Sequence, residues 1–226
     1  MSYSVIIPTL NEADNIQSCL LKLQTIKNNG EIIVVDGGST DNTVELAQIL
    51  SDKVISSDKG RASQMNAGAK IATGKMLIFL HADTSLPDNA LDLIKQSNNS
   101  WGRFDIKLTG KPFMLKVVAW FMNWRSRLTG IATGDQVIFV NRQLFNQVGG
   151  YPDIALMEDI SLCTVLKKIS KPDCLKAKVT SSGRRWEKFG VFRTILLMWS
   201  LRLGYFFTEK PEVLAKLYSR GQFWKP

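Results

Sequence analysis

VVDGGSTD at residues 34–41 is the stretch that most clearly indicates the fold, because a β-branched run ends there in an acid and a glycine-containing turn. Similar apolar runs alternate with amphipathic stretches through the first hundred residues. The predicted strands are 4–7, 31–35, 53–56 and 76–80, and the predicted helices between them are 16–23, 44–50 and 62–71. This alternation is typical of βαβ units. We therefore predict an α/β fold with a mostly parallel sheet flanked by helices.

Polar residues follow three of these predicted strands. They read PTLNE at residues 8–12, DGGSTD at 36–41 and HAD at 81–83. Open α/β sheets bind ligands at the carboxyl ends of their strands, where loops and helix N-termini converge. We therefore expect a ligand site on this rim of the sheet, with several carboxylates in it.

The second half of the chain departs from strict βαβ repetition. Its predicted elements are strands at 101–108 and 136–140 and helices at 113–128, 157–168 and 191–207. The basic and aromatic stretch GRRW lies at residues 183–186, and a polar tail follows the last helix. A chain of 226 residues is long enough for one sizeable core. We predict a single domain over residues 1–226.

The charge balance is basic. Lys and Arg number 29 against 20 Asp and Glu, which leaves a net charge of +9 and favours anionic partners. Nucleic acid, nucleotide diphosphates and anionic lipids all qualify. A nucleic-acid-binding module is one alternative, but no recognised motif supports it, and carboxylates at three strand ends disfavour contact with a phosphate backbone. We expect no nucleic-acid partner.

Several features favour a cytoplasmic location. Three cysteines without CxxC spacing argue against a disulfide framework or a zinc site. The N-terminus lacks the features of a signal peptide. The most apolar stretches, at 117–124 and 194–201, are far shorter than the roughly 20 residues that span a bilayer.

Two acids suit the recognition of a nucleoside. Asp36 follows the second predicted strand and Glu12 the first, so both can accept hydrogen bonds from a base or a ribose. Helix capping is the alternative, because Asp41 and Asn11 stand where N-caps belong. Both interpretations remain open from these residues alone.

Asp83 is the candidate metal ligand. It follows a buried strand, where a hard cation held by oxygen ligands can bridge two phosphates. His81 stands two residues earlier and projects the same way in an extended chain, as a second ligand or as a supporting donor. The alternative for a lone histidine is a structural role.

The motifs IIPTLNE (6–12), VVDGGSTD (34–41) and FLHAD (79–83) resemble, in order and spacing, those of family-two glycosyltransferases. The resemblance implies a GT-A fold, a nucleotide-diphosphate sugar donor, and Mn2+ or Mg2+ held by an Asp-x-Asp element. Here that element is reduced to Asp83, with His81 in the first position, and the usual pair of acids in the second motif is Asp36-Gly37. The nucleotide-sugar site implied by these motifs contains Pro8, Thr9, Glu12, Asp36, Ala82 and Asp83.

An acidic pair at the start of a predicted helix, Glu158-Asp159, matches a further mark of the family. Asp159 is the candidate general base, because a carboxylate beside the acceptor hydroxyl can remove its proton during an inverting displacement. Glu158 is assigned to acceptor binding. The alternative is an acidic first turn that complements the helix dipole.

Further candidates surround these sites. Arg61 and Arg185 suit the phosphates of the donor, since guanidinium binds phosphate oxygens bidentately, and the resemblance places 183–186 on a loop that closes over the donor. Solvated surface charge is the alternative for both arginines. Acceptor binding is assigned to Asp135, Gln136 and Trp186, although a turn would also explain the first two.

The helices predicted at 113–128 and 191–207 combine aromatic residues with flanking cations. They fit either packing in the core or peripheral contact with the inner face of the cytoplasmic membrane. The second interpretation is consistent with a lipid-linked or envelope acceptor.

The sequence thus predicts an inverting glycosyltransferase whose acceptor is an unidentified hydroxyl compound. Residues 1–100 form the nucleotide-sugar half, 101–182 the acceptor half and 183–226 a basic and aromatic helical extension. The chain resembles a short subgroup without transmembrane segments that is associated, by family naming, with arsenosugar biosynthesis. The alternatives are a nucleotidyltransferase and a sugar-nucleotide-binding protein without catalytic activity.

Overall fold

The computed structural model describes residues 2–27, 30–208 and 211–220, and its strands form one eight-stranded sheet. The strands are β1 (Tyr3–Thr9), β2 (Gly30–Asp36), β3 (Lys53–Ser56), β4 (Met76–Phe79), β5 (Thr84–Ser85), β6 (Trp101–Thr109), β7 (Ile138–Asn141) and β8 (Asp173–Ser182). The helices are α1 (Ala13–Ile26), α2 (Thr43–Leu50), α3 (Arg61–Ile71), α4 (Ala90–Gln96), α5 (Met114–Thr129), α6 (Arg142–Gln147), α7 (Glu158–Ile169), α8 (Arg184–Phe189), α9 (Val191–Thr208) and α10 (Pro211–Arg220), with a single 3-10 turn η1 (Gly134–Gln136).

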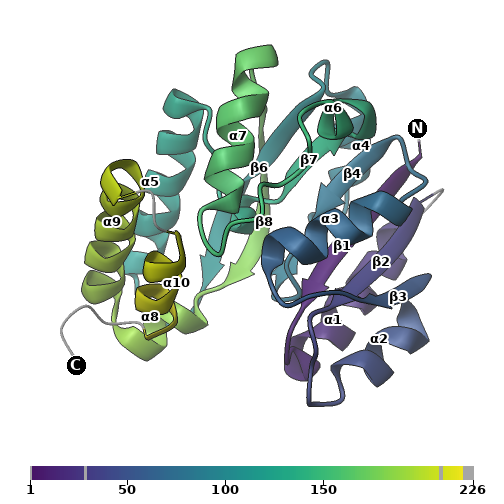
Figure 1. The fold of residues 1–226 in the computed structure, drawn as a ribbon, viewed down its shortest axis with the longest axis horizontal. Helices are drawn as coiled ribbons and strands as arrows, with labels where there is room; N and C mark the ends of the chain where they lie inside the picture. The colour runs from purple at the N-terminus through teal and green to yellow at the C-terminus, as the bar shows by residue number, and fades with distance from the viewer. Residues whose placement is uncertain (1, 28–29, 209–210, 221–226) are drawn as a thin grey trace.

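The sheet has a parallel half and a mixed half, in the order β3-β2-β1-β4-β7-β6-β8-β5 (Figure 1). β1 runs parallel to β2 and β4, and β2 runs parallel to β3. β7 runs antiparallel to both β4 and β6, so the two halves join where β4 pairs with β7. The predicted α/β class is confirmed. The carboxyl ends of β1, β2 and β4 lie at one rim, as ligand binding in such sheets requires.

Helices cover both faces of the sheet. Apolar residues of α1, α2, α4 and α5 pack against one face, and those of α3, α6 and α7 pack against the other. This explains why the central strands are apolar without alternation, since a parallel strand between two helix layers is buried on both sides. A third apolar cluster joins α9 and α10 to the N-terminal end of α7.

A buried ionic network fixes α5 on β6. Asp105 pairs with Arg103, which is 1% exposed, and with Arg127 of α5 at 2.7 Å. Asn123 of α5 accepts a hydrogen bond from the amide of Ile106 at 2.8 Å and donates one to its carbonyl at 3.0 Å. One face of α5 is therefore tied to the sheet, while its opposite face stays exposed.

Three local predictions are wrong. Residues 183–186 are not a loop, because α8 begins at Arg184. The residue before this helix, Gly183, leaves no room for a side chain, because a Cβ there would lie 2.1 Å from the carbonyl oxygen of Thr109. The segment after residue 207 is not simply a polar tail, because Leu214 of α10 is buried in the third cluster, although a helix there agrees with the helical extension predicted over 183–226. The strand predicted from 136 begins at Ile138, because η1 comes first.

Candidate functional site

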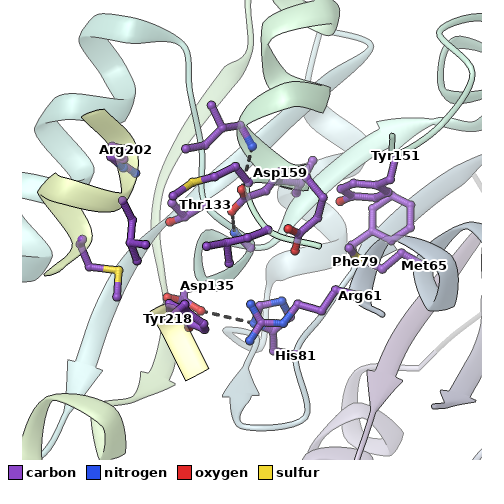
Figure 2. Close-up of a pocket in the computed structure, with 18 residues that line it drawn as sticks. Arg61, Met65, Phe79, His81, Thr133, Asp135, Tyr151, Asp159, Arg202 and Tyr218 are labelled. Atoms are coloured by element: carbon purple, nitrogen blue, oxygen red, sulfur yellow. Dashed lines mark hydrogen bonds and ion pairs between the residues drawn. The ribbon is translucent and has the colours of Figure 1, made fainter. Parts of the chain in front are cut away.

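Two cavities adjoin at the carboxyl rim of the sheet. The larger, of about 650 Å³, lies over the ends of β1 and β4, between α3 and α8. The smaller, of about 110 Å³, lies between the start of α7, the middle of α9 and the C-terminal part of α10, and Figure 2 shows its lining. Both cavities are bordered by Arg61, His81, Asp135 and Tyr218. A ligand in one cavity therefore lies beside a ligand in the other.

Most of the residues predicted for the nucleotide sugar line the larger cavity. These are Pro8, Thr9, Glu12, Arg61, Ala82, Asp83 and Arg185, and they are joined there by His81, Asp135 and Trp186. They come from segments that the motifs placed at strand ends. The structure thus brings together the ends of β1 and β4, the start of α3 and the helix α8.

Asp36 is the exception. It is 4% exposed and does not line either cavity. Its carboxylate accepts hydrogen bonds from the amides of Gly38 and Ser39, both at 2.9 Å, and from the Ser39 hydroxyl. Its oxygens hold the turn after β2. Asp41 also acts structurally, because its carboxylate accepts the amide of Ala13 at 3.2 Å, at the start of α1.

Gln64 of α3 is a site residue that sequence reasoning missed. It is buried, it lines the larger cavity, and its Nε2 donates to the carbonyls of Thr9 at 2.7 Å and Val35 at 2.8 Å. The side chain therefore ties the ends of β1 and β2 to α3. A lone glutamine within an amphipathic stretch carries no signal for such a role.

Asp83 and Glu12 share one cationic partner. The Nη2 atom of Arg184 lies 3.1 Å from a carboxylate oxygen of Asp83 and 3.3 Å from one of Glu12. Arg184 is half exposed. Burial lowers its pKa, but the charges of Glu12 and Asp83 outweigh this effect, so the pKa of Arg184 is raised overall. Sequence reasoning had singled out the motif that contains Arg184 but assigned no role to this residue.

His81 pairs with Asp135. Its Nδ1 atom lies 3.3 Å from a carboxylate oxygen of Asp135, and its ring packs on Gly134, where a Cβ would lie 2.6 Å from the ring. Among the described residues, no group of three or more His, Cys, Asp and Glu side chains could enclose a metal. The remaining donor set, centred on Asp83, still fits Mg2+ or Mn2+, because such ions commonly take one or two carboxylates and complete their coordination with substrate phosphates.

Asp159 lies in the smaller cavity at the start of α7 (Figure 2). One of its oxygens accepts the amide of Gly134 and the other the amide of Ile160, both at 2.7 Å. These bonds orient the carboxylate. Met157, two residues before Asp159, has a φ of 72°. This left-handed conformation is rare for a residue other than glycine, and such conformations are concentrated at functional sites.

Glu158 borders the same cavity but is 6% exposed. Burial, and then the neighbouring charge of Asp159, raise the pKa of Glu158 to about 7, while Arg61 acts in the opposite direction. A buried carboxyl beside a carboxylate favours the neutral form. Glu158 is therefore mainly neutral below pH 7.

The residues predicted to bind the acceptor do not all line the same cavity. Asp135 lies between the two cavities. Burial raises its pKa, but the hydrogen bond from His81 and the charges of His81, Arg61 and Arg185 outweigh this effect, so the pKa of Asp135 is lowered overall. Gln136 is fully buried, and its amide donates to the hydroxyl of Ser126 at 3.0 Å, so it supports η1 and borders neither cavity.

The helices α8 and α10 meet over the larger cavity. The guanidinium of Arg185 lies 3.7 Å from the centre of the Tyr218 ring and donates to the Tyr218 carbonyl. Arg185 is thus half buried by a contact that the sequence could not indicate. Tyr218 lies in the segment predicted as a polar tail, and only the packing of α10 brings it to the site.

Residues 4–98 match the family model described as "Glycosyl transferase family 2", which is less than half of the chain. A "PGL/p-HBAD biosynthesis glycosyltransferase" of Mycobacterium bovis is 43% identical over 93 residues, which cover 37% of this chain and 36% of that protein. The "Glycosyltransferase AglE" of Haloferax volcanii is 40% identical over 92 residues, which cover 36% of this chain and 30% of that protein. The chain spans about a third of the length of these curated relatives.

Solved structures match far more of the chain. TarS 1-349 of S. aureus in complex with UDP has a TM-score of 0.65 at 21% identity and covers 85% of this chain and 64% of that chain. The mannosyltransferase PcManGT from Pyrobaculum calidifontis in complex with GDP-Man and Mn2+ has a TM-score of 0.64 at 19% identity and covers 97% of this chain and 69% of that chain. The predicted GT-A fold is confirmed by these likenesses.

Proposed function

We propose that this chain is an inverting glycosyltransferase that moves a sugar from a nucleotide-diphosphate sugar to an acceptor hydroxyl. The observation that carries the proposal is the meeting of two cavities from different halves of the chain. The larger is built largely from the half that matches the family model, and the smaller contains Asp159. A donor and an acceptor placed in them would meet near Asp135 and His81.

We assign the donor to the larger cavity. Among the residues that line it, Glu12 would accept hydrogen bonds from the ribose, and Arg61, Arg184 and Arg185 would hold the diphosphate. Asp83 would hold Mn2+ or Mg2+, which when bound neutralises the charge that develops on the departing diphosphate. Relatives in solved complexes contain UDP, or GDP-Man with Mn2+, which supports this class of donor.

We assign the acceptor to the smaller cavity. Asp159 is oriented by two backbone amides and would accept the proton of the attacking hydroxyl. Attack from this side, opposite the departing diphosphate, inverts the anomeric carbon in one step and needs only one base. Glu158, which is mainly neutral below its raised pKa of about 7, would in that form donate a hydrogen bond to the acceptor without adding a second negative charge.

A panel of UDP-, GDP- and dTDP-sugars, with and without Mn2+, tests the donor assignment by thermal unfolding. At about 100 times its Kd a ligand stabilises by about 2.7 kcal/mol, so we expect one nucleobase class to raise the Tm by about 5–10 °C when Mn2+ is present. Asp83→Asn should lose the increment that Mn2+ adds.

The matched control is Asp92→Asn, an exposed acid of α4 remote from both cavities, which should behave as wild type. A protein that no nucleotide sugar stabilises in either condition contradicts the proposal. Stabilisation by nucleoside triphosphates with sugar phosphates, in preference to nucleotide sugars, points instead to a nucleotidyltransferase.

The outer faces of α5 and α9 support peripheral attachment to a membrane, on the cytoplasmic side. One face of each helix packs on the core, and a stripe of apolar residues on each helix is exposed. The stripe of α9 contains Phe192, Leu196, Trp199, Leu203 and Phe206, and that of α5 contains Trp120, Phe121, Trp124 and Leu128. In the described part of the chain, no helix has the length and apolar character needed to cross a bilayer. Such faces suit a helix that lies in the interface plane.

Flotation with vesicles of phosphatidylcholine and phosphatidylglycerol tests this surface. We expect wild-type protein to float at low salt, and less as salt rises, because basic charge contributes to the attraction. The double variant Trp120→Ser and Trp199→Ser should bind at least five-fold more weakly. Ile49→Ser, an exposed apolar residue of α2, is the matched control. Wild-type protein that stays unbound at low salt contradicts the assignment.

The resemblance to the subgroup associated with arsenosugar biosynthesis offers one hypothesis for the acceptor. It rests on the motifs of the first half, whereas the acceptor would contact the second half. The chemistry of the smaller cavity is therefore the better guide to the acceptor.

A further inference from the structure

Two arginines beside the smaller cavity carry charge that their surroundings do not neutralise. Arg202 of α9 lines the cavity (Figure 2). The charge of Arg202 lowers the pKa of Arg125 of α5, which does not line the cavity. The ion pairs between described residues use Lys27, Lys53, His81, Arg103, Arg127 and Arg184 as cations, and neither of these two arginines. The buried Nη2 atom of Arg125 has no hydrogen-bond partner among the described residues.

The electrostatic environment of this pair is unfavourable. Burial, and then the charge of Arg202, lower the pKa of Arg125 to about 10. Burial also lowers the pKa of Arg202, and Asp159 opposes the effect on both arginines. Two positive charges therefore share the attraction of one carboxylate in a partly dehydrated place, which costs free energy unless an anion binds there.

Two other arginines, Arg103 and Arg127, have a structural role between α5 and β6. Arg103 and Arg127 both bind Asp105, which compensates their charge. Arg125 is on the same helix as Arg127 but has no comparable partner in the described chain. The pair is therefore not explained by the packing of α5 on β6.

The donor diphosphate does not account for the pair either. The larger cavity is lined by Arg61, Arg184 and Arg185, and Arg202 is not part of its lining. Arg202 instead shares the smaller cavity with Asp159. An anion bound there would belong to the acceptor.

We infer that Arg202, supported by the charge of Arg125, binds a phosphate group carried by the acceptor, next to the hydroxyl that Asp159 would deprotonate. A phosphate monoester carries a charge of about −1.5 to −2 at pH 7, which matches two uncompensated guanidinium groups. Arginine also binds phosphate oxygens bidentately. The inference rests on the proposed function, because it names the chemistry of that function's acceptor.

Inorganic phosphate is the probe, compared with sodium chloride at equal ionic strength in thermal unfolding. We expect phosphate to raise the Tm of the wild type by about 3 °C, and this increment to fall by more than half in Arg202→Gln and in Arg125→Gln. In chloride, both variants should melt no lower than wild type, because each relieves the repulsion between the arginines. Arg193→Gln, an exposed arginine of α9, should keep the full increment.

Two results would overturn the inference. Variants that melt lower in chloride and keep the phosphate increment would show that the arginines stabilise the fold. An increment that disappears only in Arg184→Gln would place the phosphate in the donor cavity. If Arg125→Gln does not fold, Arg202→Gln on the cavity wall decides alone. A phosphate increment that depends on Arg202, in a protein that no nucleotide sugar stabilises, would refute the donor assignment but leave the anion site standing.

Two further probes identify the source of the phosphate. sn-Glycerol 3-phosphate represents a soluble acceptor, and phosphatidylcholine vesicles with about one-fifth phosphatidic acid represent a lipid headgroup. Loss of the response in Arg202→Gln for the soluble probe alone assigns a soluble acceptor, and loss for the vesicles assigns a lipid. Equal responses of wild type and variant to both probes count against the site.

Discussion

Replacing Asp159 by asparagine should lower the rate of nucleoside diphosphate release from the donor by about 10² to 10⁴-fold, which is the usual contribution of a general base. Asparagine has nearly the same shape and can still accept one of the two amides that orient Asp159. It cannot take the proton of the attacking hydroxyl. The measurement is release of the diphosphate at saturating donor, with water as the acceptor where no better one is known.

Donor binding separates this effect from misfolding. Asp159 does not line the larger cavity, so the Tm increment produced by the donor should persist in Asp159→Asn. Asp92→Asn provides the same chemical change on the exposed surface of α4 and should retain wild-type release. Release within a factor of three of wild type in Asp159→Asn would remove this residue from the mechanism.

Replacing Glu158 by glutamine should stabilise the protein at pH 8 and hardly change its stability near pH 4.5. The pKa of Glu158 is raised from 4.5 to about 7 in the folded state, so between these values the folded state binds more protons than the unfolded state. The stability that this carboxyl contributes is present below pH 4.5 and is lost as pH rises through 7. At about 1.4 kcal/mol per pKa unit, the loss approaches about 3 kcal/mol, and the neutral glutamine avoids it.

Urea unfolding of both proteins at pH 5 and pH 8 measures this difference. The gain from Glu158→Gln should increase between the two pH values, and its direction follows from burial, the larger cause of the raised pKa. Glu45→Gln, an exposed acid of α2, should show no such increase. A gain of equal size at both pH values would mean that Glu158 is ionised in the folded protein throughout this range.

We expect the two acids of this pair, Glu158 and Asp159, to have different roles. Both residues stand at the start of α7, yet one is held by backbone amides at the cavity and the other is buried. A fold that buries Glu158 loses stability as the pH rises from about 4.5 to about 7, and such costs are commonly concentrated at functional sites. This favours a functional over a merely capping role for the pair.

Sequence alone determined the fold class and the rim at which the site lies. Alternating apolar runs specify strands and helices locally, and the rule that parallel strands bind ligands at their carboxyl ends needs no coordinates. The expectation that Glu12, Asp83 and Arg61 would gather agrees with their common place in the larger cavity. Each follows or begins an element that the pattern had already located.

Only the tertiary structure decided which way individual side chains turn. Asp36 stands at the end of β2, and Gln136 directly follows the cavity residue Asp135, but both are buried, because nearby donors and acceptors satisfy them there. Arg202 and Tyr218 are distant in sequence from the motifs, yet the packing of α9 and α10 on α7 brings them to the cavities. These contacts depend on how elements far apart in the chain pack together, and periodicity within one element carries no information about that packing.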